Sequence, residues 1–293
     1  MSHLSLCALP DGRTLAWAEF GDPDGLPVVQ LHGTPGGRLV GATEEDRLVR
    51  QGLRLIAPER PGYGASDPRP GRTVVDDADD VVAVMDACQV DRAVVIGGSG
   101  GGPHALAMGA AAPDRVLAVG VLVGATPSLL PDEVELLVGV NRQVHEHRTD
   151  PAALRQLLEP VREAILRDGL ASVVPDAAEA DREKILARAG ESERAVRSAL
   201  DRGVEGMVDD YVALWGMPWG FELASVAAPV VWAHGLQDHF VPHAAATRTA
   251  ADLPDCRFVT WSDAGHIPSP ELVGEFRVAV LGAALAGMGR PVG

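Results

Sequence analysis

One serine of the chain stands between two pairs of glycines, in the run Gly-Gly-Ser-Gly-Gly at residues 97–101. An apolar stretch precedes this run and a stretch of helix-forming residues follows it. Glycine is needed where the chain turns so tightly that a Cβ atom would collide with neighbouring backbone. The pattern fits G-x-S-x-G, in which a strand–turn–helix connection exposes a serine hydroxyl as a nucleophile. We therefore predict that Ser99 attacks a carbonyl carbon, the alternative being an incidental serine in a glycine-rich turn.

A serine hydroxyl becomes a good nucleophile only when a base accepts its proton, and imidazole is the base available near neutral pH. His266 follows a predicted strand at residues 257–261, and Asp238 follows another at residues 229–233. A carboxylate beside the imidazole fixes its tautomer and stabilises the imidazolium ion. Asp263 is a rival for this acid because it is close to His266 in sequence, but Asp238 has the strand-end position. We expect Ser99, Asp238 and His266 to form a catalytic triad.

These three residues must be brought together by the elements that end beside them. Predicted strands cover residues 4–9, 14–20, 27–31, 53–57, 93–96, 116–123, 229–233 and 257–261. Predicted helices cover residues 42–51, 74–88, 104–112, 244–252 and 271–286. Strands that alternate with helices pair in parallel through right-handed crossovers. The predicted fold is therefore α/β, with a mostly parallel sheet flanked by helices. Open α/β sheets carry their sites at the carboxyl ends of the strands, where Ser99, Asp238 and His266 would meet.

Residues 126–220 interrupt this alternation with a helical, charge-rich stretch that prolines and glycines divide into short pieces. We predict an inserted helical cap there, between two parts of an α/β core at residues 1–125 and 221–293. The end of the insertion is rich in aromatic residues and contains no arginine or lysine. Trp215, Met217 and Trp219 are therefore candidates to bind the apolar body of a substrate, although such side chains more often pack in a core.

The predicted helix at residues 74–88 begins with four aspartates, at positions 76, 77, 79 and 80. Acidic side chains are favourable in the first turns of a helix because of its dipole. We expect these four to form a solvated face rather than a metal site.

Composition narrows the class of partner. The chain has 25 Lys and Arg against 41 Asp and Glu, a formal net charge of −16, and Lys184 is its only lysine. Such a surface repels nucleic acid and anionic membranes, so the expected partner is a neutral or weakly charged small molecule. The three cysteines are widely separated, so no disulfides are expected. No ligand spacing typical of a metal site occurs, and we expect neither a metal nor a cofactor. The first residues do not form a signal peptide, so a cytoplasmic location is expected. The composition leaves the oligomeric state open.

Five motifs along nearly the whole chain resemble, in order, those of the α/β-hydrolase superfamily. They are HGTPGG at 32–37, RPGYG at 60–64, GGSGG at 97–101, HGLQD at 234–238 with VP at 241–242, and GH at 265–266. The resemblance implies that the backbone N–H groups of Thr34 and Gly100 form an oxyanion hole, which stabilises the negative charge of a tetrahedral intermediate. His32 and Arg60 are expected to brace their loops rather than to react.

Serine at the elbow, where similar dehalogenases and epoxide hydrolases have aspartate, implies acyl transfer through an acyl-enzyme. We expect a serine hydrolase that cleaves a carboxylic ester or lactone of a small, largely apolar molecule. The HGTPGG loop also resembles that of proline iminopeptidases, so an aminopeptidase or amidase stays open, as does a C–C bond hydrolase with the same triad. A ligand-binding member of the fold without hydrolytic activity is the third alternative.

Overall fold

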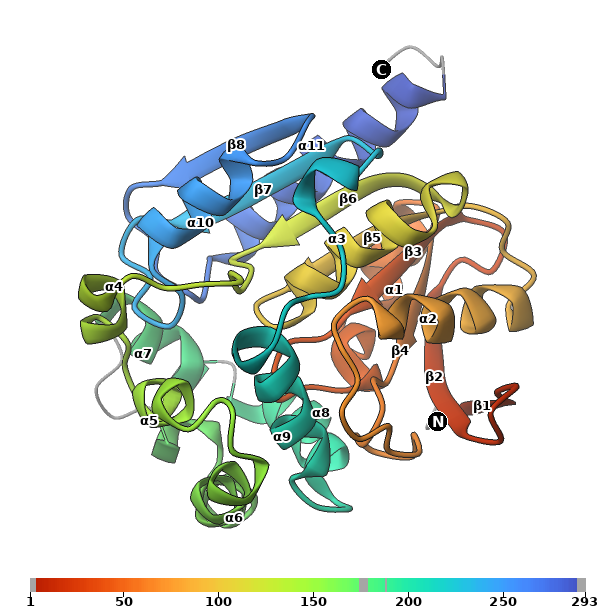
Figure 1. Ribbon diagram of the computed structural model, residues 1–293. Helices are drawn as coiled ribbons and strands as arrows, with labels where there is room; N and C mark the ends of the chain where they lie inside the picture. The colour runs from red at the N-terminus through yellow and green to blue at the C-terminus, as the bar shows by residue number, and fades with distance from the viewer. Residues whose placement is uncertain (1–3, 174–178, 188, 289–293) are drawn as a thin grey trace.

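The computed structural model describes residues 4–173, 179–187 and 189–288. Its strands form one sheet in the order β1-β2-β4-β3-β5-β6-β7-β8 (Figure 1). β2 pairs in antiparallel fashion with β1 and β4, and all other neighbouring strands are parallel. The predicted α/β class with a mostly parallel sheet is confirmed. The strands are β1 Ser5–Ala8, β2 Thr14–Gly21, β3 Leu26–Leu31, β4 Leu53–Pro58, β5 Ala93–Gly98, β6 Val116–Leu122, β7 Val230–Gly235 and β8 Cys256–Trp261.

Helices cover both faces of the sheet because successive side chains of a strand point to opposite faces. In β5, Val95 belongs to the apolar cluster that includes residues of α2, α3 and α10. Its neighbours Val94 and Ile96 belong to the cluster on the other face, with residues of α1 and α11. The central strand is therefore buried on both sides. These helices are α1 Glu45–Arg50, α2 Asp76–Ala87, α3 Gly101–Ala111, α10 His243–Ala251 and α11 Pro270–Gly287.

A group of helices lies between β6 and β7 in the sequence and gathers below the sheet in Figure 1. No strand occurs among the described residues of 126–220, as the sequence predicts, and this stretch is called the cap below. In the part of the chain that the structure describes, no helix is both long and apolar enough to cross a membrane. The cap helices are α4 Pro131–Glu135, α5 Asn141–Glu146, α6 Pro151–Asp168, α7 Glu179–Ala187, α8 Ala189–Leu200 and α9 Glu205–Tyr211.

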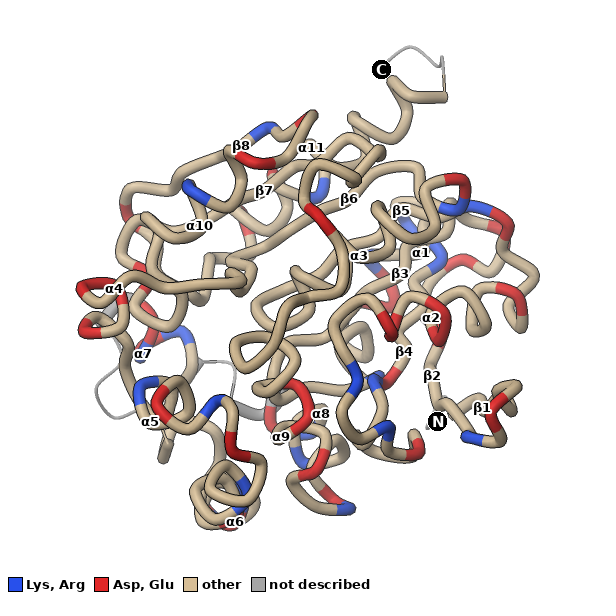
Figure 2. Tube along the Cα trace, in the orientation of Figure 1, with Lys and Arg blue, Asp and Glu red and all other residues tan. Residues whose placement is uncertain are grey.

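Charged residues lie mainly on helices and loops, and the central strands β5, β6 and β7 carry no Asp, Glu, Lys or Arg (Figure 2). The solvated face predicted for the aspartates of α2 is wrong at two positions, because Asp77 and Asp80 are buried. Asp80 accepts hydrogen bonds from Arg13 at 2.8 and 2.7 Å, and Asp77 accepts one from Arg72 at 2.9 Å. Arg13 comes from the turn between β1 and β2, far from α2 in the sequence, and Arg72 from the loop just before the helix, and pairing is what makes a buried charge tolerable.

Candidate active site

Ser99 lies in the turn between β5 and α3, at the carboxyl end of a central strand. Its φ of 52° is in the left-handed region, where a residue with a Cβ atom is strained. The fold holds it there, because the Ser99 N–H donates to the Leu122 carbonyl and the Ser99 carbonyl accepts from the Gly102 N–H, both at 2.9 Å. A Cβ atom on Gly97 would lie 2.0 Å from the Gly101 carbonyl oxygen. The tight turn therefore requires glycine at position 97, two residues before the serine.

His266 and Asp238 lie next to Ser99 in a chain of hydrogen bonds. His266 Nε2 is 3.0 Å from Ser99 Oγ, and His266 Nδ1 is 2.8 Å from Asp238 Oδ2. An ionised carboxylate only accepts hydrogen bonds, so Nδ1 carries the hydrogen and Nε2 accepts from the serine hydroxyl. Asp263, the rival acid, is exposed to solvent. The three residues that we expect to form the triad therefore meet with the orientation that proton transfer from serine to imidazole needs.

The surroundings of Asp238 keep it ionised. Burial alone would raise the pKa of this carboxyl group, but His266 and His234 beside it hold the pKa below its ordinary value. Two backbone N–H groups, of residues 240 and 241, donate to its Oδ1 at 2.9 Å each. For His266 burial has the opposite effect and lowers the pKa. The Asp238 carboxylate nevertheless raises this pKa above its ordinary value, and Asp181 adds to the increase. The imidazole is consequently a stronger base than a free histidine.

The loop at residues 32–37 packs directly against the serine turn. A Cβ atom on Gly33 would lie 3.4 Å from Ser99 Cβ, and one on Gly100 would lie 2.4 Å from Thr34 Oγ1. α3 begins immediately after Gly100, and the N-terminal end of a helix favours a negative charge. The structure thus brings Thr34 and Gly100, the residues that the resemblance implies as oxyanion-hole donors, to the side of the nucleophile.

A cavity of about 220 Å³ opens beside Ser99 and His266, with walls from both cap and core. Asn141 and Tyr211 are polar members of its wall, and none of the described residues that line it is Asp, Glu, Lys or Arg. In the described part of the chain no cluster of His, Cys, Asp and Glu could hold a metal ion. Apolar side chains of the cap that line the cavity include Val161, Ile165, Leu170, Ile185, Met207 and Trp215.

Comparison with known proteins agrees with this architecture, because residues 27–271 match the model of a family described as having the alpha/beta hydrolase fold. The chain belongs to this family. The hydrolase is 30% identical over 250 residues to the pimeloyl-[acyl-carrier protein] methyl ester esterase of Aromatoleum aromaticum, a match that covers 82% of this chain and 91% of the esterase. Because its relatives are named as hydrolases and esterases, the protein is an enzyme of the α/β-hydrolase family.

Two further likenesses show how diverse the relatives are. The hydrolase is 28% identical over 250 residues to the 2-hydroxy-6-oxononadienedioate/2-hydroxy-6-oxononatrienedioate hydrolase of Cupriavidus pinatubonensis, covering 82% of this chain and 80% of that one. Among solved structures, the enol-lactonase from Burkholderia xenovorans LB400 superposes with a TM-score of 0.69 at 19% identity. That alignment covers 95% of this chain and 99% of the lactonase chain and shows a shared fold.

His32 and Arg60 brace the loops of the hydrolase, as predicted. The Arg60 guanidinium donates to the Gly33 carbonyl at 3.0 Å and to the Thr34 hydroxyl oxygen at 3.2 Å, and it also binds the His32 carbonyl. His32 Nε2 accepts from the Arg60 backbone N–H at 3.1 Å, which leaves the hydrogen on Nδ1 to be donated to the Gly33 carbonyl at 2.8 Å. Burial lowers the pKa of His32 well below its ordinary value, in agreement with a neutral ring.

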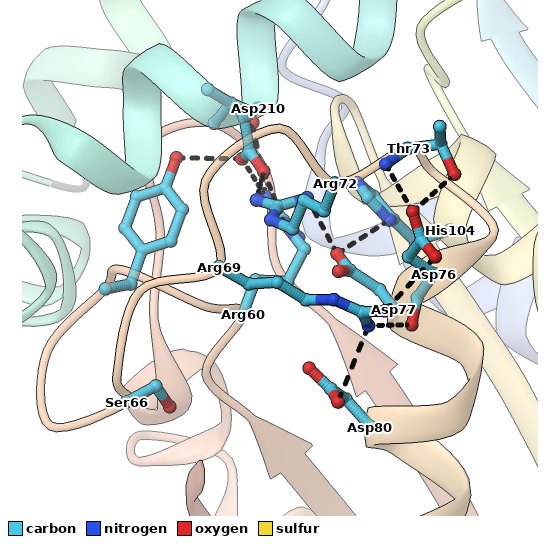
Figure 3. A network of polar contacts seen from close by, with 12 residues as sticks. Arg60, Ser66, Arg69, Arg72, Thr73, Asp76, Asp77, Asp80, His104 and Asp210 are labelled. Atoms are coloured by element: carbon cyan, nitrogen blue, oxygen red, sulfur yellow. Dashed lines mark hydrogen bonds and ion pairs between the residues drawn. The ribbon is translucent and has the colours of Figure 1, made fainter. Parts of the chain in front are cut away.

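Behind this loop lies a network of buried charges that the sequence did not reveal (Figure 3). Asp210, on α9 of the cap, is fully buried and pairs with Arg60 at 2.6 Å and also with Arg72. Its Oδ2 accepts a hydrogen bond from the Thr34 hydroxyl at 2.6 Å. Burial alone would raise the pKa of Asp210, but the two arginines hold it well below its ordinary value. Asp210 and Arg60 are 150 positions apart, so no spacing pattern could have paired them.

The three cap residues proposed from the sequence as substrate contacts have different surroundings. Trp215 lines the cavity, and its Nε1 donates to the Thr126 carbonyl at 3.1 Å. Trp219 and Met217 are not among the residues that line it. Trp219 is buried, donates to the Leu214 carbonyl at 3.0 Å and stacks on Phe221. Its position corresponds to the alternative of core packing, because its side chain joins the end of the cap to the following core segment.

Asp181, on α7 of the cap, is another residue that sequence reasoning missed. It is fully buried and accepts hydrogen bonds from the backbone N–H groups of His266 at 2.9 Å and Ile267 at 2.7 Å. α7 is predominantly charged in sequence and gives little sign that one of its carboxylates turns inward. The only available signal was an acidic residue at helical spacing from the apolar Ile185.

Proposed function

We propose that this hydrolase is a serine esterase that cleaves a carboxylic ester or lactone of a small, uncharged, largely apolar molecule. The observation that carries the proposal is the apolar cavity beside Ser99, whose described lining contains no Asp, Glu, Lys or Arg. A cavity of this kind favours an uncharged acyl group, since a buried charge needs a partner. The substrate is a small molecule, and the cap, residues 126–220, closes its binding site.

The first half of the reaction follows from the hydrogen bonds around Ser99. The hydroxyl attacks the carbonyl carbon while its proton passes to His266 Nε2, 3.0 Å away. Asp238 stabilises the imidazolium ion through Nδ1. The carbonyl oxygen, now an oxyanion, accepts hydrogen bonds from the backbone N–H groups of Thr34 and Gly100. The alcohol then leaves with the proton from Nε2, and the acyl group stays on Ser99 as an ester.

The second half repeats these steps with water as the nucleophile. His266 takes a proton from the water, which attacks the acyl carbon, and returns it to Ser99 Oγ as the carboxylic acid is released. The apolar wall that the cap contributes to the cavity limits access of other nucleophiles and shapes the space for the acyl group. Each proton transfer passes through His266, which is already in hydrogen-bond contact with Ser99 and Asp238.

The absence of charge in the described lining favours a neutral ester over the charged substrates of two other kinds of hydrolase. An aminopeptidase must bind the ammonium group of its substrate, and the described lining offers no carboxylate for it. A dioate, such as the name of the Cupriavidus relative contains, carries a second carboxylate, and the lining offers no arginine or lysine to pair with it. Both comparisons favour a neutral ester.

Replacement of the nucleophile tests the mechanism. Ser99→Ala is expected to lower kcat on p-nitrophenyl hexanoate by a factor on the order of 10⁴ or more with the fold unchanged by circular dichroism. A fluorophosphonate probe should label the wild-type protein and not the variant. A ligand-binding protein without hydrolytic activity would show neither turnover nor labelling, and retention of activity by Ser99→Ala would refute the assignment.

A matched pair of esters tests the substrate class. p-Nitrophenyl hexanoate and the mono-p-nitrophenyl ester of adipic acid have acyl chains of equal length and differ in a terminal carboxylate. We expect kcat/KM to be at least about tenfold higher for the neutral ester, because the carboxylate would be buried without a partner. Leucine p-nitroanilide reports on aminopeptidase activity. Faster cleavage of the charged ester or of the anilide would contradict the proposal.

A further inference from the structure

The segment that carries His266 is a loop, and a residue of the cap binds two of its backbone N–H groups. It follows β8, and its backbone N–H groups at residues 266 and 267 both point to one carboxylate, that of Asp181. Each carboxylate oxygen accepts one hydrogen bond: Oδ2 from the His266 N–H at 2.9 Å and Oδ1 from the Ile267 N–H at 2.7 Å. Hydrogen bonds to an ionised acceptor are stronger than those between neutral groups.

The contact is close enough to dictate the residue before the histidine. A Cβ atom on Gly265 would lie 2.3 Å from Asp181 Oδ2. The carboxylate therefore occupies the space that a side chain at position 265 would fill, and Asp181 is fully buried there. The glycine of the GH motif thus makes room for a group from the cap.

The same helix also reaches the cavity. Ile185 lies one turn after Asp181 on α7 and lines the cavity, whereas Arg182 and Glu183 between them are exposed. Residues four positions apart lie on the same face of a helix. One face of α7 therefore carries both an apolar wall of the acyl site and the anchor of the His266 loop.

We propose that Asp181 is a positioning residue of the active site, a cap carboxylate that fixes the backbone of His266 so that Nε2 stays in line with Ser99 Oγ. This inference rests on the serine esterase function proposed above. Asp238 holds the imidazole from its Nδ1 side, but a ring attached to a movable backbone could still shift away from the serine. Asp181 fixes the other end of the residue. A displacement of about 1 Å between reacting groups can reduce a rate on the order of 100-fold.

The charge of Asp181 gives a second, independent readout. The groups that face His266 are Asp238 from the segment after β7, Asp181 from α7, the Ser99 hydroxyl and the Phe240 ring, whose centroid is 5.1 Å from that of His266. Of these, the two carboxylates favour the imidazolium ion and raise the pKa of His266, Asp238 more than Asp181. Loss of the Asp181 charge should therefore lower this pKa, so that kcat/KM begins to rise at lower pH.

The experiment compares Asp181→Asn with Glu183→Gln, which removes the same charge from the exposed side of α7. For Asp181→Asn we expect kcat to fall about 10- to 100-fold on both p-nitrophenyl acetate and p-nitrophenyl hexanoate, with KM nearly unchanged. Its apparent pKa for kcat/KM should shift downwards, and labelling by a fluorophosphonate should slow in parallel. Glu183→Gln should match the wild type in all four measurements.

Ile185→Ala separates positioning from loss of the acyl wall. This variant should lose more kcat/KM on the hexanoate than on the acetate, whereas Asp181→Asn should lose the same factor on both esters. If Asp181→Asn does not fold by circular dichroism, Asp181→Glu takes its place, keeping the charge and the pH profile but lowering kcat. Wild-type kcat and pH profile in the variant, or a loss confined to the hexanoate, would overturn the proposal. Absence of Ser99-dependent hydrolysis in the wild type would instead overturn the esterase function.

Discussion

The protonation of His266 determines the pH range in which the enzyme is active, because only the neutral imidazole accepts the Ser99 proton. The sequence predicts that kcat/KM rises through an apparent pKa of roughly 6 to 7. Burial lowers the pKa of His266, but Asp238 and then Asp181 raise it above its ordinary value. Since a higher pKa leaves less neutral imidazole at a given pH, the rise should lie above pH 6.5, the ordinary value for histidine.

This prediction is checked by measuring kcat/KM on p-nitrophenyl hexanoate between about pH 5 and 9, with absorbance read at the isosbestic point of p-nitrophenol. Fluorescence at each pH controls for unfolding. An inflection clearly below the ordinary histidine pKa would mean that burial outweighs the carboxylates.

How far the sequence could predict the site depends on where each residue lies along the chain. Ser99, Asp238 and His266 each follow a predicted strand, and parallel strands bring such ends to one edge, so their meeting was predictable. Asp181 and Asp210 lie on cap helices, and their partners are 85 to 176 positions away, so no local spacing pattern predicts these contacts. The mostly parallel pairing followed from the alternation of strands and helices, whereas the burial of aspartates in α2 depends on arginines that lie outside this helix.

At the scale of single elements, the segment that returns from the cap to the core contains two tryptophans with different surroundings. Trp215 lines the cavity, and Trp219 stacks on Phe221 away from it. Trp215→Ala should therefore change the ratio of kcat/KM between p-nitrophenyl hexanoate and acetate. Trp219→Ala should leave that ratio unchanged and lower the free energy of unfolding by about 3–5 kcal/mol.

Urea denaturation and the ester ratio are measured on both variants. Trp215 is also buried, so the ratio, not the stability, is the decisive quantity for it. Equal ester ratios in both variants and the wild type would show that neither tryptophan contacts the acyl group.

At the scale of the whole molecule, buried charges join cap and core. Asp210 of α9 lies between Arg60 and Arg72 of the core, and all three side chains are buried. Replacement of Asp210 by alanine would leave two guanidinium groups buried beside one fewer carboxylate. We expect Asp210→Ala to lower the free energy of unfolding by about 3–5 kcal/mol, the usual cost of breaking a buried ion pair from one side.

Urea denaturation followed by circular dichroism measures this loss, and Arg155→Ala serves as the control, since it breaks an exposed cap pair with Glu205. The control should change stability by less than about 1 kcal/mol. A loss for Asp210→Ala no larger than that of the control would mean that the network does not hold the two parts together.

The hydrogen bond from Arg60 to the Gly33 carbonyl polarises the peptide unit that Gly33 shares with Thr34. The C=O of Gly33 and the N–H of Thr34 belong to one planar trans peptide unit, so they point in opposite directions. A cation that holds the carbonyl oxygen orients the Thr34 N–H away from itself and draws electron density out of the nitrogen. Through this polarised peptide, the guanidinium strengthens a hydrogen-bond donor at the proposed oxyanion hole. The effect passes through the peptide bond, and the cavity that receives the substrate keeps its uncharged wall.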